Sequence, residues 1–157
     1  MIIVSDTSPL NYLVLVDYVE VLPQLFGQII IPQAVFDELS HAKTPAPVKK
    51  WLGTKPVWLE VRGLQTQPKN KFEKLDYGER EAIQIAEEIS ADALLIDETD
   101  GRCEAARLGF LTIGTLGVLD RAAEANLISF VEAIERLRKT PFREPKQIVE
   151  ALLNKHK

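Results

Sequence analysis

The sequence predicts an α/β protein, a three-layer α/β/α fold in which a central, mainly parallel sheet of about five strands carries helices on both faces. Two observations predict this fold class. Short apolar runs of the kind that form buried strands alternate along the chain with segments of helical periodicity. No internal repeat, low-complexity tract or long linker divides the 157 residues, so we expect a single domain over residues 1–157.

The expected strands are short and aliphatic. Residues 1–4 are apolar and end at a Ser-Asp-Thr-Ser-Pro segment, where a helix should begin. Residues 29–31 are three consecutive isoleucines, which favour a strand buried on both faces. Because strands alternate with helices, the strands should pair in parallel. They are expected near residues 1–5, 29–31, 58–61, 93–97 and 111–113.

Proline, glycine and acidic residues mark the expected helix boundaries. Pro32 should occupy the first position of one helix, and Gly27 should stop the helix before it. The helix after Asp76 has the clearest apolar face, and the polar stretch at residues 63–70 should be a loop. Helices are expected near residues 10–16, 18–26, 32–39, 45–52, 76–89, 102–108, 116–125, 130–138 and 146–153.

Cysteine and histidine are too scarce for several kinds of site. Cys103 is the only cysteine, and His41 and His156 are the only histidines. An intramolecular disulfide, a Cys/His zinc site and a triad built on several histidines are therefore excluded. No stretch reaches the ~18 apolar residues of a membrane span, and the chain starts without the basic region of a signal peptide. We therefore expect a cytoplasmic protein with no membrane partner.

Charge is unevenly distributed along the chain. Residues 136–157 hold seven Lys or Arg against two Glu, a net charge of +5, which leaves −9 for the rest of a chain whose total is −4. One interpretation of this basic C-terminal helical segment is an ordinary solvated helix face. The other is a contact surface for phosphate groups or for an acidic partner.

Carboxylates recur where the predicted sheet would build a site. Asp6 and Asp97 each follow a buried strand, and open α/β sheets bind ligands beyond the carboxyl ends of their strands. Glu38 and Glu79 share faces with apolar residues of their helices, and Asp100 lies near the start of the helix after Asp97. Each acid also has a structural alternative, as a helix cap or as part of a capping box.

A cluster of these carboxylates would favour a hard divalent cation. Neighbouring carboxylates raise each other's pKa values, and a cation removes that penalty. Oxygen ligands without His or Cys select Mg²⁺ or Mn²⁺, ions that serve phosphoryl chemistry. The sequence contains no Walker loop and no dinucleotide fingerprint, which favours phosphodiester hydrolysis over nucleotide-dependent transfer.

Over nearly its whole length the sequence resembles the PIN domain, a metal-dependent ribonuclease fold. The opening IIVSDTSPL is similar to the family's first strand, with Asp6 at its first acid and Ser8 at a neighbouring polar position. Residues 32–38, PQAVFDE, resemble the family's Pro-x-x-Val-x-x-Glu and give Glu38 as the second acid. Residues 78–83, GEREAI, resemble the Gly-Glu-x-x-Ala-Ile run of an uncharacterised PIN-like subfamily, in which Glu79 takes the third place.

The last acidic segment, LIDETD at residues 95–100, and the turn TLG at 115–117 complete the resemblance. The chain departs from the family in having Glu79 where many of its toxins have Asp. Its last segment holds three acids, so Asp97 and Asp100 both stay open as the main ligand, and the strand-end position favours Asp97. The implied catalytic residues are Asp6, Glu38, Glu79 and Asp97. The implied metal ligands are Asp6, Glu79, Asp97 and Asp100. The implied substrate contacts are Ser8 and Thr115.

The resemblance implies a Mg²⁺- or Mn²⁺-dependent endoribonuclease that hydrolyses RNA. Many similar proteins are VapC-like toxins, which implies a homodimer held inactive by a small antitoxin. The alternative is a catalytically silent PIN scaffold that binds RNA or a protein. A haloacid-dehalogenase-type phosphatase would need a second Asp where Ser8 stands, and a response-regulator receiver would need a Lys after the last strand, where none occurs.

Overall fold

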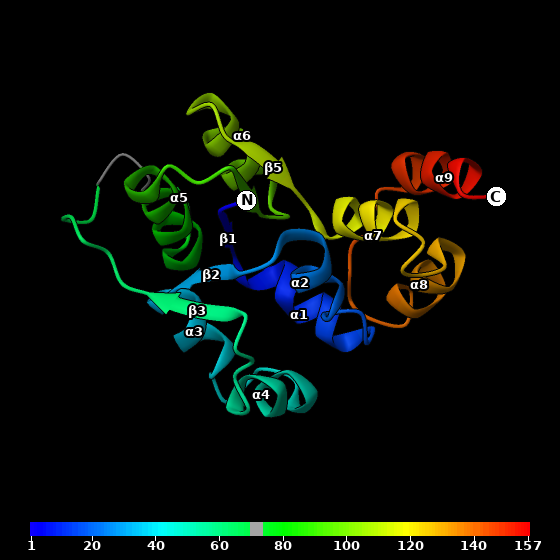
Figure 1. Ribbon diagram of the computed structural model, residues 1–157, viewed down its shortest axis with the longest axis horizontal. Coiled ribbons are helices and arrows are strands. Elements are labelled where there is room, and N and C mark those ends of the chain that lie inside the picture. The colour runs from blue at the N-terminus through cyan, green and yellow to red at the C-terminus, as the bar shows by residue number, and fades with distance from the viewer. Residues whose placement is uncertain (70–73) are drawn as a thin grey trace.

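The computed structural model describes residues 1–69 and 74–157 and contains one five-stranded sheet (Figure 1). The strand order is β3-β2-β1-β4-β5, and every neighbouring pair is parallel. The predicted fold class is therefore confirmed, as are all the expected strand positions to within two residues at either end. The strands are β1 (Ile3–Ser5), β2 (Ile29–Pro32), β3 (Leu59–Arg62), β4 (Ala93–Leu95) and β5 (Leu111–Ile113).

Each helix expected from the sequence is present, with shifted ends. Pro32 does not open its helix but caps it, because its extended ψ of 157° keeps it paired with Arg62 of β3. The first helix begins at Thr7, before Pro9, because a proline in the first turn sacrifices no helical hydrogen bond. The helices are α1 (Thr7–Leu15), α2 (Val21–Phe26), α3 (Gln33–Leu39), α4 (Ala46–Gly53), α5 (Tyr77–Ile89), α6 (Thr99–Arg107), α7 (Thr115–Glu124), α8 (Phe130–Leu137) and α9 (Lys146–Lys155).

The loop expected over residues 63–70 is confirmed as far as the structure describes it. Residues 63–69 contain no helix or strand, and Asn70 lies outside the described residues.

Strand residues alternate between two apolar layers, one on each face of the sheet. Ile3 belongs to the layer formed with α1, α2 and α7, whereas its neighbour Val4 belongs to the layer formed with α5 and α6. This alternation follows from the period of two along a strand. Since both faces are covered, nearly all strand residues must be apolar, which explains the continuous aliphatic runs of the sequence.

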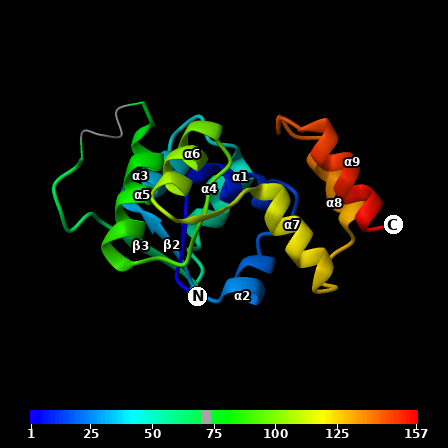
Figure 2. The same cartoon turned by 90° about the horizontal axis from the view of Figure 1, so that it is seen from above.

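The C-terminal segment packs on the rest of the chain, at the end of the molecule opposite α5 (Figures 1 and 2). Val149 of α9 is fully buried, and the ring of Phe142 stands edge-on to Tyr12 of α1 with 5.1 Å between ring centroids. Lys155 and His156 both bind Asp120 of α7. No described helix has the length and apolar character that crossing a membrane requires.

Candidate active site

The carboxyl ends of the two central strands, β1 and β4, position Asp6. Its backbone N–H donates to the carbonyl oxygen of Leu95 over 2.9 Å. Asp6 is the N-cap residue of α1, but its side chain makes no capping hydrogen bond. The side chain is 4% exposed, and its Oδ1 atom has no hydrogen-bond partner among the described residues. A capping role therefore does not account for a buried carboxylate at this position.

Glu79, in the first turn of α5, is a second buried carboxylate with a spare oxygen. The expected capping box is present: the Glu79 N–H donates to Asp76 Oδ1 over 2.8 Å, and the Asp76 N–H donates to Glu79 Oε1 over 3.3 Å. The box uses only one side-chain oxygen of Glu79. Its Oε2 is buried without a partner in the described part of the chain, and the whole residue is 6% exposed.

Glu38 of α3 lies close to Asp6, but unlike Asp6 and Glu79 it is exposed to solvent. The Thr7 hydroxyl donates to its Oε2 over 2.7 Å. Gly78 marks how closely the acids approach, because a Cβ atom there would lie 3.1 Å from both Asp6 Oδ1 and Glu38 Oε2. The glycine immediately before Glu79 therefore leaves the space in which the Asp6 and Glu38 carboxylates converge.

The pKa values of the two buried acids are raised. Burial raises the pKa of the Asp6 carboxyl well above its usual range, and the charges of Asp76, Glu79 and Glu38 raise it further, whereas a backbone hydrogen bond with Thr7 lowers it. Burial also raises the pKa of Glu79 to about 7, with a further contribution from the charge of Asp76. Both shifts mean that the folded protein resists ionisation of these groups.

The chemistry of this group suits a hard cation, since it offers carboxylate oxygens without nitrogen or sulfur. The spare Asp6 Oδ1 and Glu79 Oε2 atoms are buried acceptors, and a cation would satisfy them. Across residues 1–69 and 74–157, however, no three His, Cys, Asp or Glu side chains are already arranged to hold a metal ion. The donor atoms therefore fit a divalent ion in type and charge, without a preassembled coordination shell.

Asp97 is held differently from the other acids. Its Oδ1 accepts from the Thr115 N–H and its Oδ2 from the Thr115 hydroxyl, each over 2.7 Å. Thr115 is fully buried and is the first residue of α7, so Asp97 ties the end of β4 to the start of that helix. The expected capping of the next helix is not seen, because Glu98 is the N-cap residue of α6.

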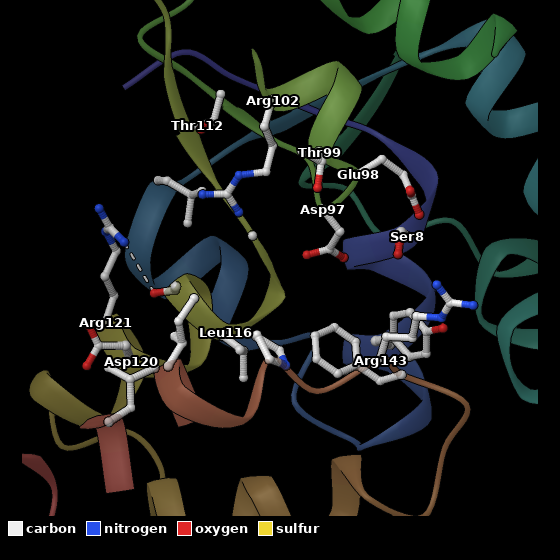
Figure 3. A pocket seen from close by; sticks show the side chains of 18 of the residues that line it. Ser8, Asp97, Glu98, Thr99, Arg102, Thr112, Leu116, Asp120, Arg121 and Arg143 are labelled. Atoms are coloured by element: carbon white, nitrogen blue, oxygen red, sulfur yellow. Dashed lines mark hydrogen bonds between the residues drawn. The ribbon is translucent and has the colours of Figure 1, made fainter. Parts of the chain in front are cut away.

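The remaining site candidates lie at the rim. Asp100 is exposed in the first turn of α6, and Ser8 lines a pocket together with Asp97 (Figure 3). The structure thus brings Asp6, Glu38 and Glu79 together, while Asp97 binds Thr115. Sequence reasoning missed the glycines that shape the site, although Gly78 stands in the quoted Gly-Glu motif.

The packing of α6 against Glu79 depends on Gly101. A Cβ atom there would lie 2.5 Å from both Glu79 Oε2 and the buried Ile96 Cδ1. We expect Gly101→Ala to lower the free energy of unfolding by about 1–2 kcal/mol, because overpacking outweighs the better helix propensity of alanine. Gly53→Ala, where a Cβ atom meets nothing within 4 Å, should be neutral or stabilising. Equal unfolding midpoints in urea for the two variants would contradict this packing.

Comparisons with known proteins agree with the fold. A family model described as DUF3368: PIN domain matches residues 2–157. Among solved structures, the chain is similar to a PilT N-terminus domain protein from the hyperthermophilic archaeon Sulfolobus solfataricus P2, with a TM-score of 0.57 and 22% sequence identity. That similarity covers 79% of this chain and 95% of the other. A comparison with curated proteins finds no match.

Proposed function

This chain belongs to the PIN-domain family, and from that premise we propose that it is a Mg²⁺- or Mn²⁺-dependent endoribonuclease. One observation carries the proposal: Asp6 Oδ1 and Glu79 Oε2 are buried carboxylate oxygens without partners among the described residues. Burying such groups costs stability unless something satisfies them. A bound cation would satisfy both oxygens and offset that cost.

Asp6, Glu38 and Glu79 would hold the ion in this proposal. When bound, the ion would lower the pKa of a water molecule and stabilise the leaving oxygen of a phosphodiester. The chain's own contacts prepare the ligands: the Thr7 hydroxyl orients Glu38, and the Asp76 amide engages Glu79 Oε1 and leaves Oε2 available. Burial of Asp6 keeps competing water from its carboxylate.

Asp97 and Asp100 supply further oxygens near the same edge of the sheet. A carboxylate can accept about four hydrogen bonds, so Asp97 keeps acceptor capacity after the two that it receives from Thr115. We propose that Thr115 fixes the orientation of Asp97, as outer hydrogen bonds commonly do for metal ligands. Asp100 would then act from an outer position, and Ser8 would contact the substrate.

The proposal predicts an absolute requirement for a divalent ion. RNA cleavage should be seen with Mg²⁺ or Mn²⁺, stop with excess EDTA and return when Mn²⁺ is restored, because the proposal assigns activation of the water and stabilisation of the leaving oxygen to the bound ion. Labelled single-stranded RNA resolved on a denaturing gel provides the measurement. Cleavage that continues undiminished in excess chelator would rule out the mechanism.

The silent-scaffold alternative also has an observation in its favour, since no three acids of the described residues are already arranged around a metal site. The same metal titration separates the two functions: a scaffold would bind RNA and leave it intact in every divalent ion tested. The homodimer, the small antitoxin and the cytoplasmic location implied by the resemblance stay predictions.

A further inference from the structure

A groove of about 670 Å³ lies beside Asp97 and is separate from the converging carboxylates of Asp6 and Glu38 (Figure 3). Its walls come from α1, the segment from Asp97 to Arg102, the start of α7 and the C-terminal residues 141–152. Three arginines from three different elements line it: Arg102, Arg121 and Arg143. In Figure 3, the side chains of Arg102 and Arg121 lie on one side of the pocket and that of Arg143 lies on the other.

None of these arginines has a carboxylate partner among the described residues. Arg121 donates only to the carbonyl oxygen of Gly117 in its own helix, over 3.3 Å, while Arg102 and Arg143 make no hydrogen bond within the described chain. Arginines elsewhere are paired, as Arg107 is with Glu104 and Arg138 is with Glu144. In the basic C-terminal segment, Arg136, Arg138 and Lys155 are paired with acids. Arg143 has no such partner in the described part of the chain, and it lines the groove.

The backbone of the groove leaves room for the Arg102 guanidinium at Gly114, whereas the contact of Arg121 at Gly117 is an ordinary one. A Cβ atom at Gly114 would lie 2.7 Å from Arg102 Nη1 and 2.9 Å from Asp97 Oδ1, and one at Gly117 would lie 3.4 Å from Arg121 Nη1. Arg102 and Arg121 are half-buried there. Neither guanidinium forms a salt bridge in the described chain, and partial desolvation of such a group favours an anionic ligand.

The three acids that line the groove, Asp97, Glu98 and Asp120, form no salt bridge with these arginines in the described part of the chain. Asp97 accepts two hydrogen bonds from Thr115, and Asp120 is bound by Lys155 and His156. Glu98 is exposed at the rim. The three arginines therefore outnumber the two lining acids, Asp97 and Glu98, that have no cationic partner in the described chain, although the chain as a whole carries a net charge of −4.

The shape and chemistry of the groove favour a nucleic acid strand over an acidic peptide. Planar guanidinium groups suit phosphates because they donate two parallel hydrogen bonds. The edge-to-face rings of Tyr12 and Phe142 form an apolar wall next to Arg143, against which a base can stack. Asp97 also lines the groove, so a strand lying in it would pass next to one of the residues proposed for cleavage.

We propose that this groove holds the RNA substrate strand and that Arg102, Arg121 and Arg143 contact its phosphates. This inference rests on the proposed ribonuclease function and adds the surface that binds the substrate. It predicts that the arginines act on RNA binding and therefore on KM.

The test compares the triple variant Arg102→Gln, Arg121→Gln, Arg143→Gln with a charge-matched control. The control replaces Lys50, Arg62 and Arg107, which lie outside the groove, by Gln. Binding of fluorescent single-stranded RNA is measured in EDTA over a range of salt concentrations, cleavage is measured with Mn²⁺, and thermal melts verify folding. If the triple variant has a lower melting temperature than wild type, the single variant Arg143→Gln, at an exposed position, is tested in its place.

We expect the groove variant to bind RNA at least about tenfold more weakly than wild type at low salt. The slope of log affinity against log salt concentration should flatten by about 2, since each lost phosphate contact with a single strand removes about 0.7. Its KM should rise by a similar factor, and the control should match the wild type in the slope of its salt dependence.

Three results would overturn the proposal for the groove. They are an unchanged salt slope in the groove variant, an equal loss in the control, and stronger arginine-dependent binding of polyglutamate than of RNA. If the wild-type protein cleaves RNA and the groove variants keep the wild-type KM, the groove proposal is wrong and the ribonuclease proposal is unaffected. If the wild-type protein neither binds nor cleaves RNA, both proposals are wrong.

Discussion

Replacing Asp6 by Asn should lower RNA cleavage by about a hundredfold or more and should at the same time stabilise the protein in EDTA. The loss of activity follows because Asp6 is the most buried of the proposed ligands and a neutral amide binds a hard cation poorly. The gain in stability follows because the variant removes a buried charge that three neighbouring acids disfavour. We expect the free energy of unfolding in EDTA at pH 7.5 to rise by about 1–2 kcal/mol.

The matched control for this variant is Asp37→Asn. Asp37 precedes Glu38 on α3, but it is exposed and accepts a hydrogen bond from Gln33 at the helix surface. Its loss should change neither activity nor stability appreciably, because surface substitutions of this kind usually have effects within about 0.5 kcal/mol. An Asp6→Asn protein that is destabilised yet fully active would show that Asp6 is structural.

The fold was readable from the sequence because local and long-range preferences agree. Three consecutive isoleucines at residues 29–31 have no stable place except in a strand covered on both faces, and the structure buries all three. Boundaries were less readable where one residue serves two elements. Pro32 ends β2 and caps α3 because its pairing with Arg62, a contact between distant parts of the chain, holds it in the strand.

The candidate site was readable to the extent that it depends on position along an element. Strand ends and helix faces were enough to single out Asp6, Glu38 and Glu79 as acids that could meet. The partner of Asp97 was not readable, because Thr115 lies 18 positions later and is brought to it only by the pairing of β4 with β5. Arg143 belongs to the basic segment that the sequence marked as a candidate contact for phosphate groups. Arg102 and Arg121 were missed, because they come from α6 and α7 and meet Arg143 only in the folded chain.

The pH dependence of stability should depend on Glu79. Its pKa is about 7 in the folded protein against an ordinary 4.5, so between these values the folded protein keeps a proton that the unfolded chain releases. The stability that this proton contributes is fully present below about pH 4.5 and is lost as the pH rises through 7. Asp6 acts in the same direction, because its pKa is also raised by burial. We therefore expect the protein in EDTA to lose stability between pH 5 and about pH 7.5.

Glu79→Gln should reduce this loss of unfolding free energy by up to about 3 kcal/mol, because glutamine keeps the volume of the side chain and does not titrate. The measurement is urea unfolding in EDTA at about pH 5 and about pH 7.5 for wild type, Glu79→Gln and Glu135→Gln, an exposed glutamate of α8. Added Mn²⁺ should stabilise wild type more at the higher pH, where protons no longer compete for the carboxylate, and should stabilise Glu79→Gln less. Suppose that Glu79→Gln loses as much stability between the two pH values as wild type and Glu135→Gln do. The buried carboxylate is then not the source of the pH dependence, and the case for a cation at Glu79 Oε2 fails as well.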